Sequence, residues 1–297
     1  MAASVRQRLS KIAANRGVDF QQVLVSYAIE RLLYRISVSP HAQSFILKGA
    51  TLFTLWEGFP HRQTRDVDLL GFGENSVVQL EIVFTEILRT PVPDDGLIFG
   101  TVVRAETIRA LQEYGGVRVH LTARLEKARI AVGVDVGFGD SIHPSPKMVD
   151  FPTLLDFPKP RVRAYPAETV IAEKLQAMVH LGLANSRMKV FFDLWHLGRG
   201  MNFDGPALGQ AVQETFRRRE TLIPEDTPLA LTEAFAKNPM KVVQWNGFIR
   251  KTVGSRAPVE LAAVVAFLNS FLGPILAQCR TCRSVLKKWP AGGPWTA

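Results

Sequence analysis

The chain has 297 residues, enough for one large domain or two, and its 47% hydrophobic and 21% charged residues are ordinary for a globular protein. No apolar run approaches the roughly 20 residues of a membrane span, and no continuous apolar segment follows the basic N-terminus, so we expect a cytoplasmic protein without a secretory signal. The net charge of +9 favours a polyanionic partner, nucleic acid or nucleotide phosphate, over simple solubility charge.

Residues 4–36 predict two helices separated by Gly17-Val18-Asp19, with Asp19 placed to cap the second helix. The serine and proline residues of 37–41 close this helical hairpin. Its basic side chains could bind nucleic acid or a partner, but we favour the simpler interpretation of a solvated helix face. The side chains concerned are Arg6, Arg8, Lys11, Arg16, Arg31 and Arg35.

The most informative stretch covers residues 45–72. An apolar run ends in Lys48-Gly49, and a turn-rich basic piece then leads into Asp66-Val67-Asp68-Leu69-Leu70. If this last segment is a strand, Asp66 and Asp68 point to the same face, because side chains alternate along a strand. Buried carboxylates must be paired or bind a metal. Two hard oxygen ligands beside a glycine turn suit Mg²⁺ and a nucleoside triphosphate.

The hydrophobic pattern next predicts a helix over residues 76–89. It then predicts three strands, over 97–105, 117–125 and 130–137. The last two strands form a hairpin through the four-residue connection 126–129. Along residues 117–122, polar and apolar side chains alternate, as expected of a sheet with one wet face. The strand over 130–137 is apolar throughout except for one carboxylate, Asp135.

Three carboxylates at the ends of adjacent strands, Asp66, Asp68 and Asp135, could hold two Mg²⁺ ions. Such ions neutralise triphosphate charge and activate a hydroxyl for attack on the α-phosphate. Gly49 would allow the close backbone approach that phosphates need, and Thr51 could donate its hydroxyl. The alternative is that Asp66 pairs with a nearby arginine and that Asp135 merely ends its strand. The glycine turn and the third carboxylate together favour the metal site.

Residues 139–163 are rich in proline and predict an extended connection, after which Pro166 can start a helix over 168–183. Lys174 borders the apolar side of this helix, where a lysine often reaches a phosphate as a point charge. On the next helix, Lys189 and Asp193 are four residues apart and can pair. A surface salt bridge worth under about 1 kcal/mol is the alternative, but the aromatic residues around Asp193 disfavour it.

The motifs LKGxTLF, RxTxDVDLL, an isolated strand aspartate, AETVIAEKLQAMV and RxKxxxDLW occur in this order. Together they resemble the AbiEii/AbiGii nucleotidyltransferase toxin family, which includes the MenT-like toxins and belongs to the DNA polymerase β-like nucleotidyltransferase superfamily. The resemblance covers most of the chain and is strongest over residues 45–72 and 166–197. It implies an α/β (α+β) fold, with a mixed sheet, flanking helices and a C-terminal helical half.

The resemblance also implies roles for individual residues. Asp66 and Asp68 match the DxD metal ligands, and Asp135 matches the third carboxylate, the base or a ligand of the second metal. Gly49 and Thr51 match the glycine turn, where Ala50 departs from the usual Gly-Ser or Gly-Gly-Thr.

Five further residues complete the predicted site. Lys48 and Arg65 are assigned with the glycine turn to nucleotide binding. Lys174 matches the phosphate-binding lysine of the family. Lys189 and Asp193 match the last motif, which assists nucleotide binding and catalysis.

We therefore expect three parts, a helical hairpin (1–44), a nucleotidyltransferase core (45–150) and a helical domain (151–297), with the nucleotide cleft between the last two. The expected reaction is Mg²⁺-dependent transfer of NMP from an NTP to RNA, the tRNA 3′ end first. The chain would act as the toxin of a bacterial toxin–antitoxin or abortive-infection (phage-defence) system with a cognate antitoxin. The rivals are the same chemistry on a small-molecule or protein hydroxyl, and a catalytically silent nucleotide- or nucleic-acid-binding protein. Replacing Lys174 by Ala is expected to weaken NTP use without unfolding the chain.

Overall fold

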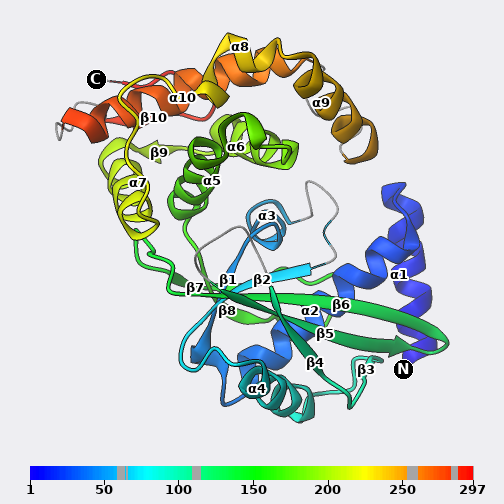
Figure 1. Ribbon diagram of the computed structural model, residues 1–297. Coiled ribbons are helices and arrows are strands. Elements are labelled where there is room, and N and C mark those ends of the chain that lie inside the picture. The colour runs from blue at the N-terminus through cyan, green and yellow to red at the C-terminus, as the bar shows by residue number, and fades with distance from the viewer. Residues whose placement is uncertain (59–63, 65, 109–114, 253–259, 282–286, 297) are drawn as a thin grey trace. The chain divides into compact units, whose positions relative to one another are not determined.

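The chain forms two compact units in the computed structural model (Figure 1), which describes residues 1–58, 64, 66–108, 115–252, 260–281 and 287–296. The first unit comprises residues 1–140 and 146–165, and the second comprises 141–145 and 166–297. The N-terminal helices therefore belong to the same unit as the sheet.

Two helices open the first unit. The helix α1 (Ala2–Arg16) ends at Gly17, whose φ of 61° is left-handed. The helix α2 (Phe20–Val38) begins at Asp19, which accepts a hydrogen bond from the Gln22 amide at 3.2 Å, so the predicted cap is confirmed.

The interpretation of a solvated basic face is wrong for two of its residues. Arg31 and Arg35 on α2 are only 1% and 5% exposed. Arg35 forms an ion pair with Asp95 at 2.7 Å, and Arg31 donates to the Pro158 carbonyl. Since α2 packs against the sheet on its apolar side, these arginines are enclosed and must find partners inside the unit.

The sheet of the first unit is mixed. Its strands are β1 (Phe45–Lys48), β2 (Asp66–Gly71), β3 (Ile98–Phe99), β4 (Arg104–Ile108), β5 (Gly116–Leu125), β6 (Ala128–Phe138), β7 (Lys147–Asp150) and β8 (Arg161–Ala164). Their order is β3-β5-β6-β2-β1-β8-β7, and β4 also pairs with β5. The pairs β2–β6 and β1–β8 are parallel, and the others are antiparallel.

Two expectations about strands need correction. The strand predicted over 97–105 is two short strands, β3 and β4, which both pair with β5. The proline-rich connection contributes β7 and β8 to the sheet, because its prolines flank these short strands instead of interrupting them.

The β5–β6 hairpin is tighter than expected. Leu125 pairs with Ala128, so the turn contains two residues, Glu126 and Lys127, instead of four. Glu126 has a φ of 52°, the left-handed conformation that such a tight turn demands. This turn sets the register of every pair along the hairpin.

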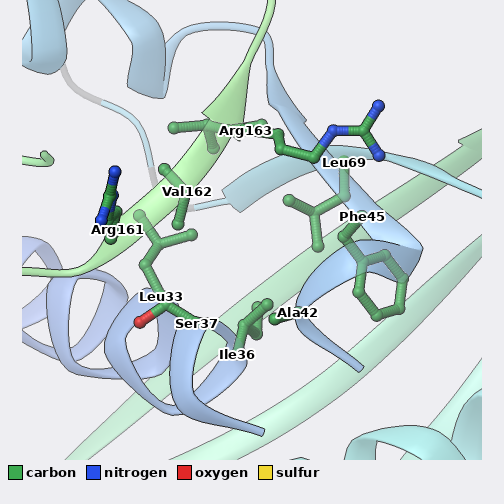
Figure 2. A pocket seen from close by; sticks show the side chains of 10 residues that line it. Leu33, Ile36, Ser37, Ala42, Phe45, Leu69, Arg161, Val162 and Arg163 are labelled. Atoms are coloured by element: carbon green, nitrogen blue, oxygen red, sulfur yellow. The ribbon is translucent and has the colours of Figure 1, made fainter. Parts of the chain in front are cut away.

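Helices cover the apolar face of the sheet. The helix α2 contacts β6 and β8, and α4 (Val77–Arg89) contacts β4, β5 and α2. A cavity on this face is lined by Leu33 and Ile36 of α2, Phe45 of β1 and Leu69 of β2 (Figure 2). Its volume of about 10 Å³ is the room that one water molecule needs, so it cannot hold a nucleotide.

The second unit is mostly helical. Its longer helices are α5 (Ala167–Leu181), α6 (Met188–Gly200), α7 (Gly205–Arg218), α9 (Pro239–Thr252) and α10 (Leu261–Thr281); the short α8 (Glu233–Ala236), β9 (Phe203–Asp204) and β10 (Lys288–Trp289) complete it. Trp289 and Trp295 from the C-terminal segment pack against Phe271 of α10. This aromatic cluster gives the unit its own core.

The helix α10 departs from the expectation that no apolar run approaches a membrane span. By length and composition it could cross a membrane, with a mean hydropathy of 1.7 over its most apolar window. However, its apolar side chains Leu268, Phe271 and Leu272 are buried, and it packs against α6, α7 and α8. A core helix of a globular unit explains this pattern.

Candidate active site

A single row of charged side chains crosses four neighbouring strands of the first unit. Arg118 of β5 pairs with Asp135 of β6, Asp135 with Asp68 of β2, and Asp68 with Lys48 of β1. Directly paired residues point to the same face of a sheet, so these four side chains stand side by side. This face is opposite to the one that carries Leu69 and the small cavity.

Asp66 stands beside this row. It is two residues before Asp68 on β2, and it pairs with Gly133 of β6, two residues before Asp135. All three carboxylates predicted from the sequence are therefore on one face of the sheet, on two adjacent parallel strands.

Two glycines make room for these carboxylates. A Cβ atom added to Gly49 would lie 1.9 Å from Oδ2 of Asp68, and one added to Gly133 would lie 2.3 Å from Oδ1 of Asp66. Gly49 also has a φ of 74°, which disfavours any side chain. By contrast, Ala50 has a right-handed helical backbone (φ −68°, ψ −25°), so its departure from the family pattern requires no glycine-like freedom.

Asp135 is held by an arginine. Arg118 donates from Nε and Nη2 to its two carboxylate oxygens at 2.6 and 2.7 Å. This hydrogen-bonded contact with Asp135 raises the pKa of Arg118 above its usual range. A bidentate contact of this kind fixes the plane of the carboxylate.

The donor set suits a hard cation in part. Asp66 and Asp68 present carboxylate oxygens on one face, as Mg²⁺ requires. Within the described residues, however, no group of three or more His, Cys, Asp and Glu side chains is close enough to form a metal cluster. Both carboxylate oxygens of Asp135 already accept hydrogen bonds from Arg118. The residues that fit a cation are therefore Asp66 and Asp68.

Lys48 has an acidic partner that the sequence did not indicate. Its Nζ donates to Oδ2 of Asp140 at 2.6 Å and lies 5.9 Å from the ring centre of Tyr165. A Cβ atom on Gly137 would lie 3.2 Å from the same Nζ, so the Lys48 side chain extends from β1 over β2 to β6.

Two other residues of the predicted nucleotide set belong to this unit. Thr51, at the start of α3 (Thr51–Glu57), is 2% exposed, and its hydroxyl has no hydrogen-bond partner among the residues that the structure describes. A buried hydroxyl without a partner is costly unless a ligand binds it. Arg65 lies outside the described residues.

The second unit carries the remaining predicted residues. Lys174 of α5 donates to Oδ2 of Asp193 of α6 at 2.7 Å, and Asp193 is fully buried. The structure thus brings these two residues together across two helices. Lys189 is exposed and lies one turn before Asp193 on α6.

Sequence reasoning missed Arg118 and Asp140. The sequence marks Arg118 only as one polar residue of an alternating strand. A two-residue turn at Glu126-Lys127 predicts its pairing with Asp135, whereas the four-residue connection 126–129 does not. Asp140 comes after the end of β6 in a glycine-rich segment, and no local pattern marks it.

A match to a family model shows that the chain is a nucleotidyltransferase. Residues 31–269, most of the chain, match the family model described as nucleotidyl transferase AbiEii toxin, type IV TA system. The chain therefore belongs to the AbiEii family of nucleotidyltransferase toxins of type IV toxin–antitoxin systems. Membership implies a nucleotide substrate and an antitoxin partner, and it confirms the family resemblance of the motifs.

One solved structure supports the fold assignment. A Helicobacter pylori protein that carries the provisional name nucleotidyltransferase is similar over 90% of this chain and 99% of its own, with a TM-score of 0.52 and 13% sequence identity. JHP933 from Helicobacter pylori is similar over 85% of this chain and 90% of its own, with a TM-score of 0.47 and 13% identity. No curated protein sequence matches this chain. The similarity to the first of these two structures confirms the α/β fold with a mixed sheet and flanking helices.

Proposed function

We propose that this protein transfers NMP from an NTP to the 3′ end of an RNA, tRNA first, with Mg²⁺, and acts in the cytoplasm as a growth-arresting toxin. The observation that carries the proposal is the pairing of Asp68 with Asp135 on parallel strands, with Asp66 on the same face and glycines at the two positions where a Cβ would meet a carboxylate. Membership of the AbiEii family supports the transferase chemistry.

In this proposal, each group in the first unit has one task. Asp66 and Asp68 hold Mg²⁺, which when bound neutralises triphosphate charge and favours attack at the α-phosphate. The buried Thr51 hydroxyl donates to a phosphate oxygen. Asp135, oriented by Arg118, accepts the proton of the attacking RNA hydroxyl.

The reaction balances as a single displacement. The RNA hydroxyl oxygen forms a bond to the α-phosphorus, the bond between that phosphorus and the bridging oxygen breaks, and pyrophosphate leaves. The proton of the hydroxyl goes to Asp135. Lys174 and Lys189 belong to the second unit, and their contact with the nucleotide phosphates stays a prediction.

The test is incubation of the protein with each labelled NTP, Mg²⁺ and total tRNA. We expect label on RNA, and we expect Asp68→Ala to lower the transfer rate by at least about 100-fold, as for other single charged groups at reacting centres. The matched control is Asp150→Ala, which removes an exposed carboxylate from the edge strand β7 of the same sheet. Absence of transfer with all NTPs, or equal transfer by Asp68→Ala, would contradict the proposal.

Salt separates the acceptor classes. An RNA acceptor predicts transfer that falls steeply between low and moderate salt, because bound phosphates release counterions. A small-molecule hydroxyl as acceptor predicts a shallow dependence.

A further inference from the structure

The carboxylate face of the sheet continues into a basic surface along the β5–β6 hairpin. Successive residues on this face of β5 are Arg118, His120, Thr122 and Arg124, and β4 and β6 add Arg104 and Arg129. We call Arg104, His120, Arg124 and Arg129 the basic strip; all four are exposed. Glu106 lies among them and contacts His120 at 2.9 Å.

The far end of the strip contains a like-charge pair. Arg124 and Arg129 are directly opposite each other on β5 and β6. Within the described part of the chain, neither guanidinium forms an ion pair, and the same holds for Arg104. Like charges in directly opposed positions destabilise a strand pair. An anionic ligand that bridges the two guanidiniums would remove this repulsion.

The geometry of the strip matches an extended polyanion. Arg129 and Asp135 are six residues apart on β6, which corresponds to about 20 Å along the strand and is long enough for several nucleotides. Between them, Ala131 and Gly133 are the residues of β6 that point to this face. Because these two side chains are small or absent, they leave room beside the arginines for a bound strand. One end of the strip lies at the row that contains Asp68 and Asp135.

We infer that the basic strip binds the sugar–phosphate backbone of a single-stranded nucleic acid, and that it guides the end of this strand toward the carboxylate row. The second half of this inference rests on the proposed function; the first half does not. An acidic protein could also bind arginines. A nucleic acid is favoured because the strip is linear, its arginines can contact phosphates bidentately, and it leads to the carboxylates.

The experiment measures RNA binding by the full-length protein without NTP or Mg²⁺. A fluorescent 20-nucleotide single-stranded RNA is titrated at several KCl concentrations, and log Kd is plotted against log salt. For Arg124→Ala/Arg129→Ala we expect the slope to fall by about 1.4, since each phosphate contact on a single strand contributes about 0.7. The control variant, Lys11→Ala/Arg16→Ala, removes two exposed charges from α1 and should keep the wild-type slope.

Each outcome decides the inference. A smaller slope in the strip variant alone supports it, provided that its melting temperature is at or above that of the wild type. An unchanged slope, or equal changes in the strip and control variants, would overturn it. A parallel titration with labelled polyglutamate covers the acidic protein: loss of polyglutamate binding with RNA binding intact would overturn the nucleic-acid assignment. Because the RNA titration contains no NTP, its result can be interpreted even if the protein shows no nucleotidyl transfer.

Discussion

At the scale of single residues, two glycines determine where the carboxylates can stand. Gly49 and Gly133 occupy the positions where a Cβ atom would meet Asp68 and Asp66. Gly49 therefore has two reasons to be glycine, its positive φ and the close approach of Asp68. Gly58, at the end of α3, has the same backbone requirement (φ 77°), but no atom of the described residues lies within 4 Å of its Cβ position.

Gly49 and Gly58 permit a matched test. Alanine at either position costs about 1–2 kcal/mol of backbone strain, but only Gly49→Ala displaces Asp68. We expect Gly49→Ala to lose at least about 100-fold in nucleotidyl transfer and Gly58→Ala to retain most activity at a similar melting temperature. Equal rates for the two variants would show that Asp68 does not depend on Gly49.

Arg118 permits a test of cation binding that does not depend on activity. Its positive charge beside the carboxylates opposes a divalent cation, so Arg118→Ala should tighten Mn²⁺ binding about sevenfold, the scale of one unit charge acting on a divalent ion at about 7 Å in water. Electron paramagnetic resonance of free Mn²⁺ measures this affinity. The control is Arg124→Ala, on the same face of β5 but about 20 Å away, beyond the screening length of about 10 Å. Weaker Mn²⁺ binding by Arg118→Ala would contradict this expectation. It would show that the cation site requires Arg118.

At the scale of helices, the contact between α5 and α6 changes an expectation. Lys174→Ala was expected to weaken nucleotide use without unfolding the chain. Asp193, however, is fully buried and accepts from Lys174 at 2.7 Å. Removing the cation leaves a buried carboxylate without this partner, so we now expect Lys174→Ala to lose about 3 kcal/mol in urea unfolding.

A second variant separates stability from nucleotide binding. In Lys174→Ala/Asp193→Asn the buried negative charge is also removed, so part of the lost stability should return. If Lys174 binds phosphate, NTP affinity stays low in this more stable double variant. If Lys174→Ala were as stable as the wild type, the structural role of the Lys174–Asp193 pair would be contradicted.

The helix α2 is tied to the proline-rich segment through Glu30. This residue is 1% exposed, pairs with Arg31 at 2.9 Å and accepts from the Leu154 amide at 2.6 Å. Burial raises the pKa of Glu30 to about 7. The folded state therefore binds the proton more tightly than the unfolded state, and the stability that this group contributes is lost as pH rises through about 7.

The corresponding prediction compares the wild type with Glu30→Gln, which keeps an acceptor for the Leu154 amide. Between pH 5 and pH 8, the free energy of unfolding of the wild type should fall by about 2–3 kcal/mol relative to the variant. Urea unfolding at four pH values measures the difference. Parallel pH profiles for the two proteins would show that Glu30 titrates at its ordinary pKa.

At the scale of the whole molecule, the two units have separate cores. Residues 1–165 contain the complete mixed sheet, including β8, which pairs with β1, and Tyr165, whose amide donates to the Leu47 carbonyl at 3.0 Å. We expect this fragment to unfold cooperatively in urea, with a smaller m-value than the full chain because less surface becomes exposed.

The matched fragment 1–140 lacks β7, β8 and the carbonyl of Pro158 to which Arg31 donates. It should be less stable than 1–165 by at least about 3 kcal/mol, since a buried arginine loses an acceptor. Equal stability would mean that residues 146–165 are not an integral part of the first unit.

The sequence by itself determined the local features. The alternation of Asp66, Val67 and Asp68 placed two carboxylates on one face, Asp19 predicted a helix cap, and the ordered motifs identified the family. The strand alternation and the helix cap depend on a period or a spacing within a few residues, and such local geometry is independent of the rest of the fold. The motifs are recognised by their residues and their order along the chain, which also need no tertiary structure.

Only the tertiary structure decided which distant side chains meet. The register between β2 and β6 brings Asp68 beside Asp135, and the enclosure of α2 buries Arg31 and Arg35. The contact between Lys48 and Asp140 spans 92 residues of sequence. Strand register and helix burial are set by packing over the whole unit, so no local pattern along the chain contains them.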